Sequence, residues 1–320
     1  MSDFLTSLSN LFTLTFVVSS MFSLGLRLTV RQIIEPLRNV RLVLSALLAN
    51  FVIVPIAALL LSSIFNLSLD LRIGLLLFSF AAGAAFATKL AEVAKSSVRL
   101  SVSLIVLLII ATVFIMPLTL PLLLKGVRVD AVSLARPLIL QLLLPLALGI
   151  LMDSIYPEAA ESILPALGQI ANFSLALMLA LLLGLNLGNV IALLGTGAVI
   201  SILLLLTVAL TAGYFLGGPG QPAKQVLSLA TGQRNIAAAF VIATGNFPDR
   251  PNILIMLAAA GLLSMVLMMP VAAQMGKRSK TAPEDASVPV GLDRRDGNRS
   301  PILVTGETSS TDPDDEHPTR

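Results

Sequence analysis

The chain has 320 residues, of which 56% are hydrophobic and 12% charged, with a formal net charge of +3 and a mean hydropathy of +0.93. Soluble domains are roughly half apolar and about a quarter charged, so this composition excludes an ordinary soluble protein and indicates helices surrounded by lipid. Cysteine is absent and the single histidine is His317, which excludes disulfides and metal sites built from these two side chains.

Nine apolar segments are each long enough to cross the hydrocarbon core, which needs about 20 residues per helix. In chain order they are predicted at about 8–26, 41–64, 70–95, 99–123, 134–152, 163–187, 190–216, 223–245 and 252–275. The first has no basic segment before it and no small-residue cleavage site after it, so we expect a retained helix and not a signal peptide. Pro55, Pro117, Pro121 and Pro145 lie inside predicted spans and are expected to kink them.

Basic residues are distributed unequally between the predicted loops. With the N-terminus outside, and with the C-terminal segment counted only as far as Lys280, ten Lys and Arg residues lie on the cytoplasmic side against four outside. The positive-inside rule therefore predicts an outside N-terminus and a cytoplasmic C-terminus, which requires an odd number of spans. After a transmembrane domain at 1–276, residues 277–320 are rich in Pro, Ser, Asp, Arg and Gly, and they predict a disordered cytoplasmic tail.

The third and eighth predicted spans differ from the others, because small residues interrupt each near its middle and a full charge follows. The two segments are AAGAAFATKLAE (81–92) and ATGQRNIAAA (230–239), in which Gly83 and Gly232 are expected to let the helix unwind. Five spans separate the third from the eighth, so the two helices run in opposite directions. The pattern predicts two inverted repeats, at about 8–123 and 134–275, of which the first lacks its leading helix.

Lys89 and Arg234 follow the two interruptions, where a charge at the bilayer centre costs about 2.5–3.5 kcal/mol. We expect both cations to face a shared cavity and to attract a carboxylate, a sulfonate or a sterol conjugate. The alternative pairs Lys89 with Glu92, one helical turn away, and places Arg234 against carbonyls of the broken helix. Further polar candidates for substrate or ion binding are Asn50, Thr88, Thr231, Gln233 and Asn235, with Ser101 and Asn172 as weaker ones.

At these residues the chain resembles the bile acid:sodium symporter family, including its bacterial members, over about residues 8–276. The resemblance rests on Asn50 and Pro55 before the first interruption, on the Gly-containing segment 81–92, and on Gly232 to Asn235 in the second. It implies an all-α fold of two inverted repeats whose two broken helices cross behind a substrate cavity. The implied protein is a secondary transporter of an organic anion in a bacterial inner membrane, working by alternating access without a cofactor, a metal or a nucleic-acid partner.

The sodium-coupled members of this family bind two sodium ions through a Ser-Asn pair, a carboxylate and a glutamine near the crossing. The corresponding positions here hold Ala87 and Thr88, Ala230, and Arg234. A sodium ion a few Å from Arg234 or Lys89 would be repelled by several kcal/mol, on the order of 4 kcal/mol at an effective dielectric of about 20. We therefore expect sodium-independent transport in which Lys89 and Arg234 supply fixed positive charge, with proton exchange at Lys89 as a candidate for coupling.

Two alternatives remain open at this point. Sodium symport could persist through backbone carbonyls together with Asn50, Thr88, Ser101 and Asn235. A membrane-embedded transferase is less favoured, because it would need an acidic metal cluster or a nucleophile with a base near the membrane face. The acidic residues that lie close together in a loop assigned to the cytoplasm are Asp153, Glu158 and Glu161. We expect their segment to be an ordinary solvated connection and not a metal site.

Overall fold

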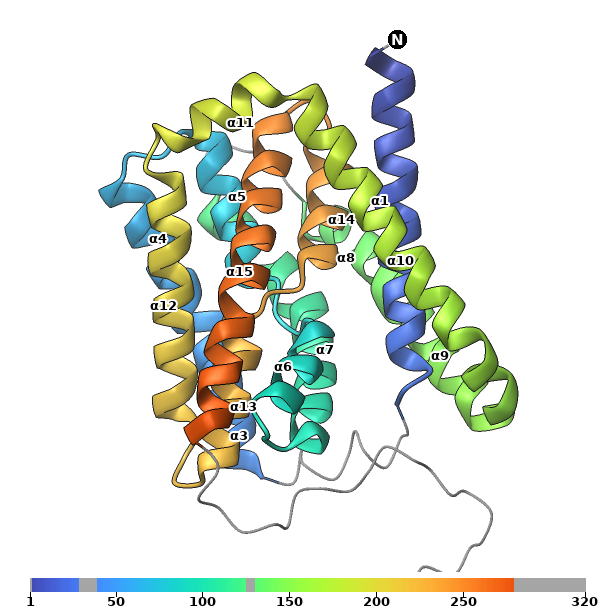
Figure 1. The fold of residues 1–320 in the computed structure, drawn as a ribbon. Helices are drawn as coiled ribbons and strands as arrows, with labels where there is room; N and C mark the ends of the chain where they lie inside the picture. Colours follow the sequence, from blue (N-terminus) through green and yellow to red (C-terminus); the bar gives the residue numbers. More distant parts are fainter. Residues whose placement is uncertain (1, 29–38, 125–129, 279–320) are drawn as a thin grey trace, which may run out of the picture. The chain divides into compact units, whose positions relative to one another are not determined.

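The computed structural model describes residues 2–28, 39–124 and 130–278, and within these residues all regular secondary structure is helical (Figure 1). The helices up to residue 124 are α1 (Ser2–Gly25), α3 (Val40–Leu48), α4 (Val54–Ile64), α5 (Leu69–Phe80), α6 (Phe86–Val93) and α7 (Val98–Leu123). Those after it are α8 (Ala131–Leu138), α9 (Leu144–Ile155), α10 (Pro157–Leu185), α11 (Leu187–Leu194), α12 (Ala198–Leu216), α13 (Gln221–Gly232), α14 (Ile236–Asn246) and α15 (Pro251–Arg278). The predicted tail from residue 279 onward, and residues 29–38 and 125–129 of two predicted loops, lie outside the described residues.

Eight helical segments of the described residues are long and apolar enough to cross a membrane: 7–25, 40–64, 98–123, 131–155, 157–185, 198–216, 221–246 and 251–277. They confirm an all-helical membrane protein and correspond to eight of the nine predicted spans. The predicted span 190–216 begins too early, because a turn at 195–197 separates α11 from α12. The predicted span 70–95 is not among the eight, because its break divides it into α5 and α6, of 12 and 8 residues.

The segment formed by α5 and α6 nevertheless runs beside the whole of α15. Near its start, the Asp70 carboxylate forms a 2.8 Å ion pair with Arg250, the residue before α15. Near its end, the Val93 carbonyl lies so close to Gly276 that a Cβ on this glycine would be 2.5 Å from it. Positions 250 and 276 are about 39 Å apart at 1.5 Å per helical residue. This length is close to the full thickness of a bilayer with its headgroups.

Of the four prolines expected to kink their spans, Pro55 and Pro145 are associated with π-helical turns. The turns Ala49–Ile53 and Ile139–Leu143 join α3 to α4 and α8 to α9, and each is followed at once by a helix with proline, Pro55 or Pro145, as its second residue. Both prolines lie inside helices that are continuous over 40–64 and 131–155, where proline lacks the N–H for an intrahelical bond and its ring clashes with the carbonyl four residues earlier, so a wider turn there relieves the clash. The irregularity expected at these prolines is therefore a wide turn just before them, whereas Pro117 and Pro121 lie within the continuous helix α7.

The broken segments lie in the middle of the packing, and the other helices cover them. In the segment 221–246, 94% of the residues in its most apolar stretch are buried, against 22–56% in the other seven candidate spans. α13 packs on α12 and α7, and α5 packs on α4 and α15. The two broken segments also contact each other, α6 with α13 and α5 with α14. Large exposed apolar side chains lie on α1, α3, α4, α7 to α12 and α15, but none lies on α6, α13 or α14. The first group therefore forms the surface suited to lipid.

Candidate site at the two helix breaks

The first break, at residues 81–85, depends on Gly83. Its φ of +82° lies in the left-handed region that only glycine adopts without strain, and a Cβ there would be 2.6 Å from the backbone nitrogen of Ile109 in α7. Thr112, one turn further along α7, accepts a hydrogen bond from the Ala82 backbone N–H at 3.2 Å, and its hydroxyl donates to the Ala82 carbonyl at 3.3 Å. The unwinding expected at Gly83 is thus found, and α7 supplies groups that hold it.

The second break follows Gly232, where α13 ends, and Asn235 links it to the first break. The Asn235 backbone N–H donates to the Ala81 carbonyl at 2.7 Å, and its side-chain Nδ2 donates to the Gly83 carbonyl at 3.2 Å. Its Oδ1 accepts from the backbone N–H of Ala238, so the same side chain caps α14. One asparagine therefore satisfies three backbone groups that the two breaks leave free.

Arg234 lies in the second break with only 2% of its surface exposed. Its Nη1 donates to Oδ1 of Asn50 at 2.8 Å, and Asn50 in turn donates from Nδ2 to the Thr231 hydroxyl at 3.2 Å and to the Ala46 carbonyl at 2.9 Å. A guanidinium has only donors, so the amide oxygen of Asn50 must face it, and the two other contacts hold the amide in that orientation. The π turn after α3 is what brings Asn50 to this place.

Within the described residues 2–28, 39–124 and 130–278, no ion pair neutralises the positive charge of Arg234. Its Nη2 is buried without a hydrogen-bond partner, and the ion pairs found among the described residues join other side chains. Gln233 Oε1 and Ser101 Oγ are the other buried side-chain atoms of the described residues without a partner. Leaving a buried charge unpaired costs several kcal/mol. The second break therefore offers donors that fit an acceptor oxygen or an anion.

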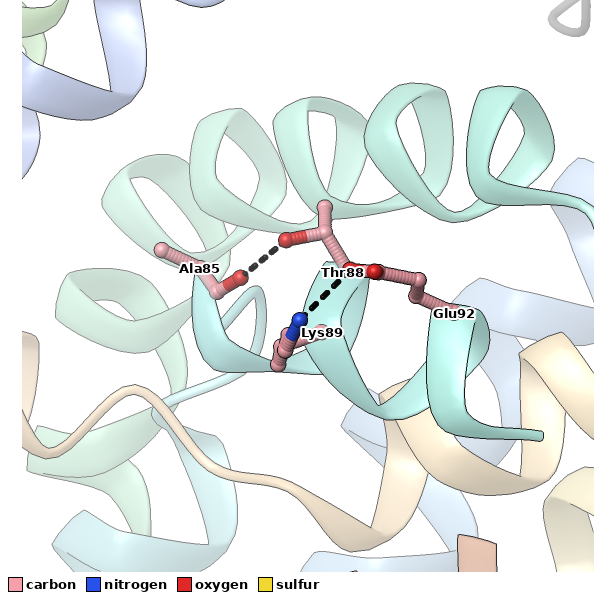
Figure 2. Close-up of polar contacts among 4 residues, drawn as sticks. All are labelled: Ala85, Thr88, Lys89 and Glu92. Carbon is pink, nitrogen blue, oxygen red and sulfur yellow. Dashed lines mark hydrogen bonds and ion pairs between the residues drawn. The ribbon is translucent and has the colours of Figure 1, made fainter. Parts of the chain in front are cut away.

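The structure does not bring Lys89 into this network. Figure 2 shows that its Nζ contacts Oε2 of Glu92 at 2.9 Å, with 54% and 62% of the two side chains exposed. In the same view the Thr88 hydroxyl donates to the Ala85 carbonyl at 2.7 Å, so it too is used locally. The contact made by Lys89 is the pairing that the sequence left as its alternative, and it arises because residues three apart share one face of a helix. The two cations therefore have different surroundings.

The described residues contain no group of three His, Cys, Asp or Glu side chains that could hold a metal ion. Carbonyl groups exposed by the first break have protein donors, since those of Ala81 and Gly83 accept from Asn235 and that of Ala82 accepts from Thr112. Ala87 and Ala230, at two positions where the resembled family has sodium ligands, are buried and offer no side-chain oxygen.

Sequence reasoning missed Thr112. Threonine inside a transmembrane helix usually bonds its own helix, as Thr119 and Thr207 do through the carbonyls four residues before them. Nothing in the sequence distinguishes Thr112 from these two. Its role depends on a neighbouring helix whose backbone is irregular, which becomes visible only in three dimensions.

Comparison with known proteins gives one family and a set of distant relatives. Residues 14–193 match the model of the sodium bile acid symporter family. A probable chloroplastic sodium/metabolite cotransporter of Oryza sativa subsp. japonica is 29% identical over 234 residues, which cover 72% of this chain and 55% of the relative. A probable chloroplastic sodium/metabolite cotransporter of Arabidopsis thaliana is 27% identical over 248 residues, which cover 72% of this chain and 59% of the relative. Another from the same plant is 24% identical over 230 residues, which cover 70% of this chain and 53% of the relative. The chain thus spans just over half the length of these relatives, and the family match includes Asn50 and the first break but ends before the second.

Proposed function

Because the chain belongs to the sodium bile acid symporter family, a family of transporters and not of enzymes, we propose that it is a secondary transporter of a small organic anion. The proposed substrate is a carboxylate, a sulfonate or a sterol conjugate. The observation that carries this proposal is the buried guanidinium of Arg234, which has one amide contact, an unpartnered Nη2 and no ion pair with a carboxylate of the described residues.

Charge and geometry both favour an anion at Arg234. A guanidinium keeps its proton at neutral pH and presents five N–H donors in a fixed plane, which matches two oxygens of a carboxylate or a sulfonate. Asn50 uses one of the two Nη groups, so the other remains for a ligand. A bound anion would neutralise the charge and satisfy Nη2 in one step, which supports Arg234 as the residue that selects substrates by charge.

The packing supports the inverted repeats expected from the sequence. In the proposed pairing α5–α6 corresponds to α13–α14, α7 to α15, and α3–α4 to α12. Under this pairing the contact of α5 with α15 has its counterpart in that of α13 with α7, and the contact of α5 with α4 in that of α13 with α12. Reciprocal contacts of this kind are what a two-fold relation between two halves would produce. The length of α5–α6 beside α15 supports it as the ninth crossing.

We propose that transport of the anion is not coupled to sodium, and that the fixed charge of Arg234 takes the place of a bound cation. A sodium ion about 4 Å from a guanidinium would be repelled by about 4 kcal/mol at an effective dielectric near 20. The carbonyls of Ala81, Ala82 and Gly83 are hydrogen-bonded to protein donors, so the first break offers fewer free oxygens to an ion. Proton exchange at Lys89 stays a candidate for coupling.

Sodium-coupled transport is the second candidate, favoured by the names of the relatives, which are probable sodium/metabolite cotransporters. The chain retains oxygens near the breaks that could contribute to a sodium site, on Asn50, Thr88 and Asn235. Ser101 adds a buried hydroxyl without a partner. The chain spans little more than half the length of these relatives, so their names alone do not decide between sodium-independent and sodium-coupled transport.

Thermal unfolding of the purified protein separates them, because a ligand that binds the folded state raises its stability by mass action. The chain would be screened against carboxylates, sulfonates and sterol conjugates in sodium and in choline buffers of equal ionic strength. We expect stabilisation by at least one class of anion to the same extent in both buffers. Stabilisation found only in sodium would favour the second candidate, and no stabilisation by any anion would count against both.

The role of Arg234 is tested in the same assay and in uptake by proteoliposomes. Arg234→Gln should abolish anion binding, and Arg234→Lys should restore little of it, because a point charge does not reproduce a planar pair of donors. Arg250→Gln is the matched control, since it removes another arginine that pairs with Asp70 at the far end of α5. Anion binding retained by Arg234→Gln would refute the site.

The proposed location is a bacterial inner membrane, with the N-terminus outside. The excess of basic residues in the loops assigned to the cytoplasm supports the orientation. Fractionation of source cells, followed by immunodetection of the full chain, would test the membrane. The names of the relatives describe chloroplast proteins, so detection in an organelle fraction would overturn this placement.

A further inference from the structure

Three helices meet at the end of the bundle that the distribution of basic residues assigns to the cytoplasm. The hydroxyl of Ser96, which follows α6, donates to the Pro222 carbonyl in the first turn of α13 at 3.1 Å. At the same end, Gly276 of α15 lies against the last turn of α6, and a Cβ on this glycine would be 2.5 Å from the Val93 carbonyl oxygen. These contacts hold the end of α6, the start of α13 and the end of α15 together.

A lysine lies within two residues of each contact: Lys95 after α6, Lys224 in α13 and Lys277 near the end of α15. Lys95 and Lys277 are exposed, and Lys224 is half-buried. None of the three forms an ion pair with a described residue, and the nearby Glu92 is already paired with Lys89. The three residues, here called the lysine patch, therefore bring like charges together from three helices, which favours an anion from outside the chain.

Lys95 occupies a backbone position that favours glycine. Its φ is +51°, and its backbone N–H donates to the Glu92 carbonyl at 2.9 Å. The Ser96 N–H donates to the Ala91 carbonyl at 2.9 Å, which completes the Schellman motif that ends many helices. Glycine is usual at this position, because a side chain strains a left-handed backbone. Asn66 is the other non-glycine residue with a positive φ in the described part of the chain, and asparagine tolerates this conformation. Helix geometry therefore does not account for a lysine at 95, whereas a use for its charge does.

An aromatic pair beside Lys224 indicates the level of the lipid headgroups. Tyr214 and Phe215 lie in the last turn of α12, and a Cβ on Gly217 at the end of this helix would be 2.4 Å from the Cα atom of Lys224. The Lys224 Nζ lies 5.6 Å from the centroid of the Tyr214 ring. Phe215 is 76% exposed and packs edge-to-face against that ring. Aromatic rings gather where hydrocarbon meets water, so the lysine patch lies at the boundary of the membrane.

We propose that the lysine patch binds the phosphate headgroup of an anionic phospholipid in the adjoining leaflet. Ammonium groups bind phosphate as point charges, and three of them exceed what a zwitterionic headgroup would neutralise. Free phosphate would satisfy the same groups, but a phospholipid presents its phosphate at the level where Tyr214 and Phe215 lie. The headgroup joins the end of α6 to α13 and α15 and so stabilises the folded bundle. The site lies at helix ends and does not depend on the proposed substrate.

Thermal unfolding of the full-length protein in lipid nanodiscs tests the site, because a lipid that binds the folded state raises its stability by mass action. Discs of phosphatidylcholine would be compared with discs in which phosphatidylglycerol replaces an increasing fraction of the lipid, at constant ionic strength. We expect phosphatidylglycerol to raise the unfolding temperature, with a half-maximal effect at a low mole fraction. Lys95→Gln, Lys224→Gln and Lys277→Gln should each raise that mole fraction about fivefold, which corresponds to about 1 kcal/mol for each basic residue.

Arg27→Gln is the matched control. Arg27 is an exposed cation assigned to the same side of the membrane, but it follows α1, which packs on α9, α10 and α14. Its replacement should change the half-maximal mole fraction less than about twofold, since salt screens distant charges. Lys95→Gly separates charge from structure, because it removes the ammonium group but suits a positive φ. It should unfold no earlier than the wild type in pure phosphatidylcholine and still show the fivefold loss.

No stabilisation by phosphatidylglycerol, or equal shifts in Arg27→Gln and the lysine variants, would overturn the lipid site. Inorganic phosphate that stabilises the protein to the same extent in phosphatidylcholine discs would also overturn it, because a free anion would then occupy the patch. If Lys224→Gln does not fold, Lys95→Gly and Lys277→Gln, at exposed positions, decide the question. The assay needs no transported substrate, so failure of the proposed function would leave its result unchanged.

Discussion

Replacing Gly83 by alanine should disable the first break, and its cost can be worked out from the geometry. At a φ of +82°, an L residue costs about 1–2 kcal/mol more than glycine. The added Cβ would also lie 2.6 Å from the Ile109 backbone nitrogen and 2.8 Å from the Ile105 carbonyl oxygen, which are main-chain atoms that cannot rotate away. Overpacking of this kind costs about 1–3 kcal/mol. The expected loss of stability is therefore about 2–5 kcal/mol.

The assay is reversible unfolding in mixed micelles with increasing SDS, followed by circular dichroism, with anion binding measured on the folded fraction. Gly245→Ala is the control, because its Cβ would meet nothing within 4 Å and it lies near the end of the helix α14. That substitution should be neutral or stabilise by up to about 1 kcal/mol. Free energies of unfolding that agree within 1 kcal/mol for the two variants would refute the account of the break.

Three further predictions concern the link between the breaks, the ion pair and the sidedness of the chain. Asn235→Ala should lower the free energy of unfolding by about 1–3 kcal/mol, because it leaves two buried backbone groups without partners; a change below 0.5 kcal/mol would contradict this. Asp70→Asn should cost less than about 1 kcal/mol, since its partner Arg250 is partly exposed and the pair is screened; a larger loss would mean that the pair holds α5 against α15. Gly220→Cys should react with impermeant thiol reagents from the cytoplasmic side and Gly195→Cys from outside, since both positions are exposed; labelling of both from one side would overturn the predicted topology.

The sequence predicts the helices and their two breaks well, because lipid imposes a simple rule on length and composition. Small residues followed by a charge inside an apolar segment have few structural solutions, so the unwinding at Gly83 and Gly232 could be expected. The start of α12 was predicted too early: the turn at 195–197 consists of Gly195, Thr196 and Gly197, with Gly197 at a φ of +75°, and so short an interruption by small residues also fits within a continuous span.

The contacts of the candidate site were less predictable than its members. Asn50 and Arg234 are 184 residues apart, and their contact depends on a π turn that no local pattern indicates. For Lys89 the sequence allowed either a shared cavity or a pair with Glu92, and the choice depends on which face of a short helix its neighbours cover. Side-chain identity indicates chemistry, whereas burial, which decides between such alternatives, is a property of packing.

The unpaired charge of Arg234 has a consequence for the energetics of a transport cycle. A cation bound from solution can be released on the far side, and its gradient can then drive accumulation. A cation that belongs to the chain returns with it, so it brings no ion gradient to the cycle. With a monovalent anion bound, the site is neutral, and the empty site is positive. The membrane potential, at about 2.3 kcal/mol per elementary charge per 100 mV, would then act on the return of the empty carrier and not on the loaded step. Exchange of one anion for another would be electrically silent, whereas net uptake would generate a current.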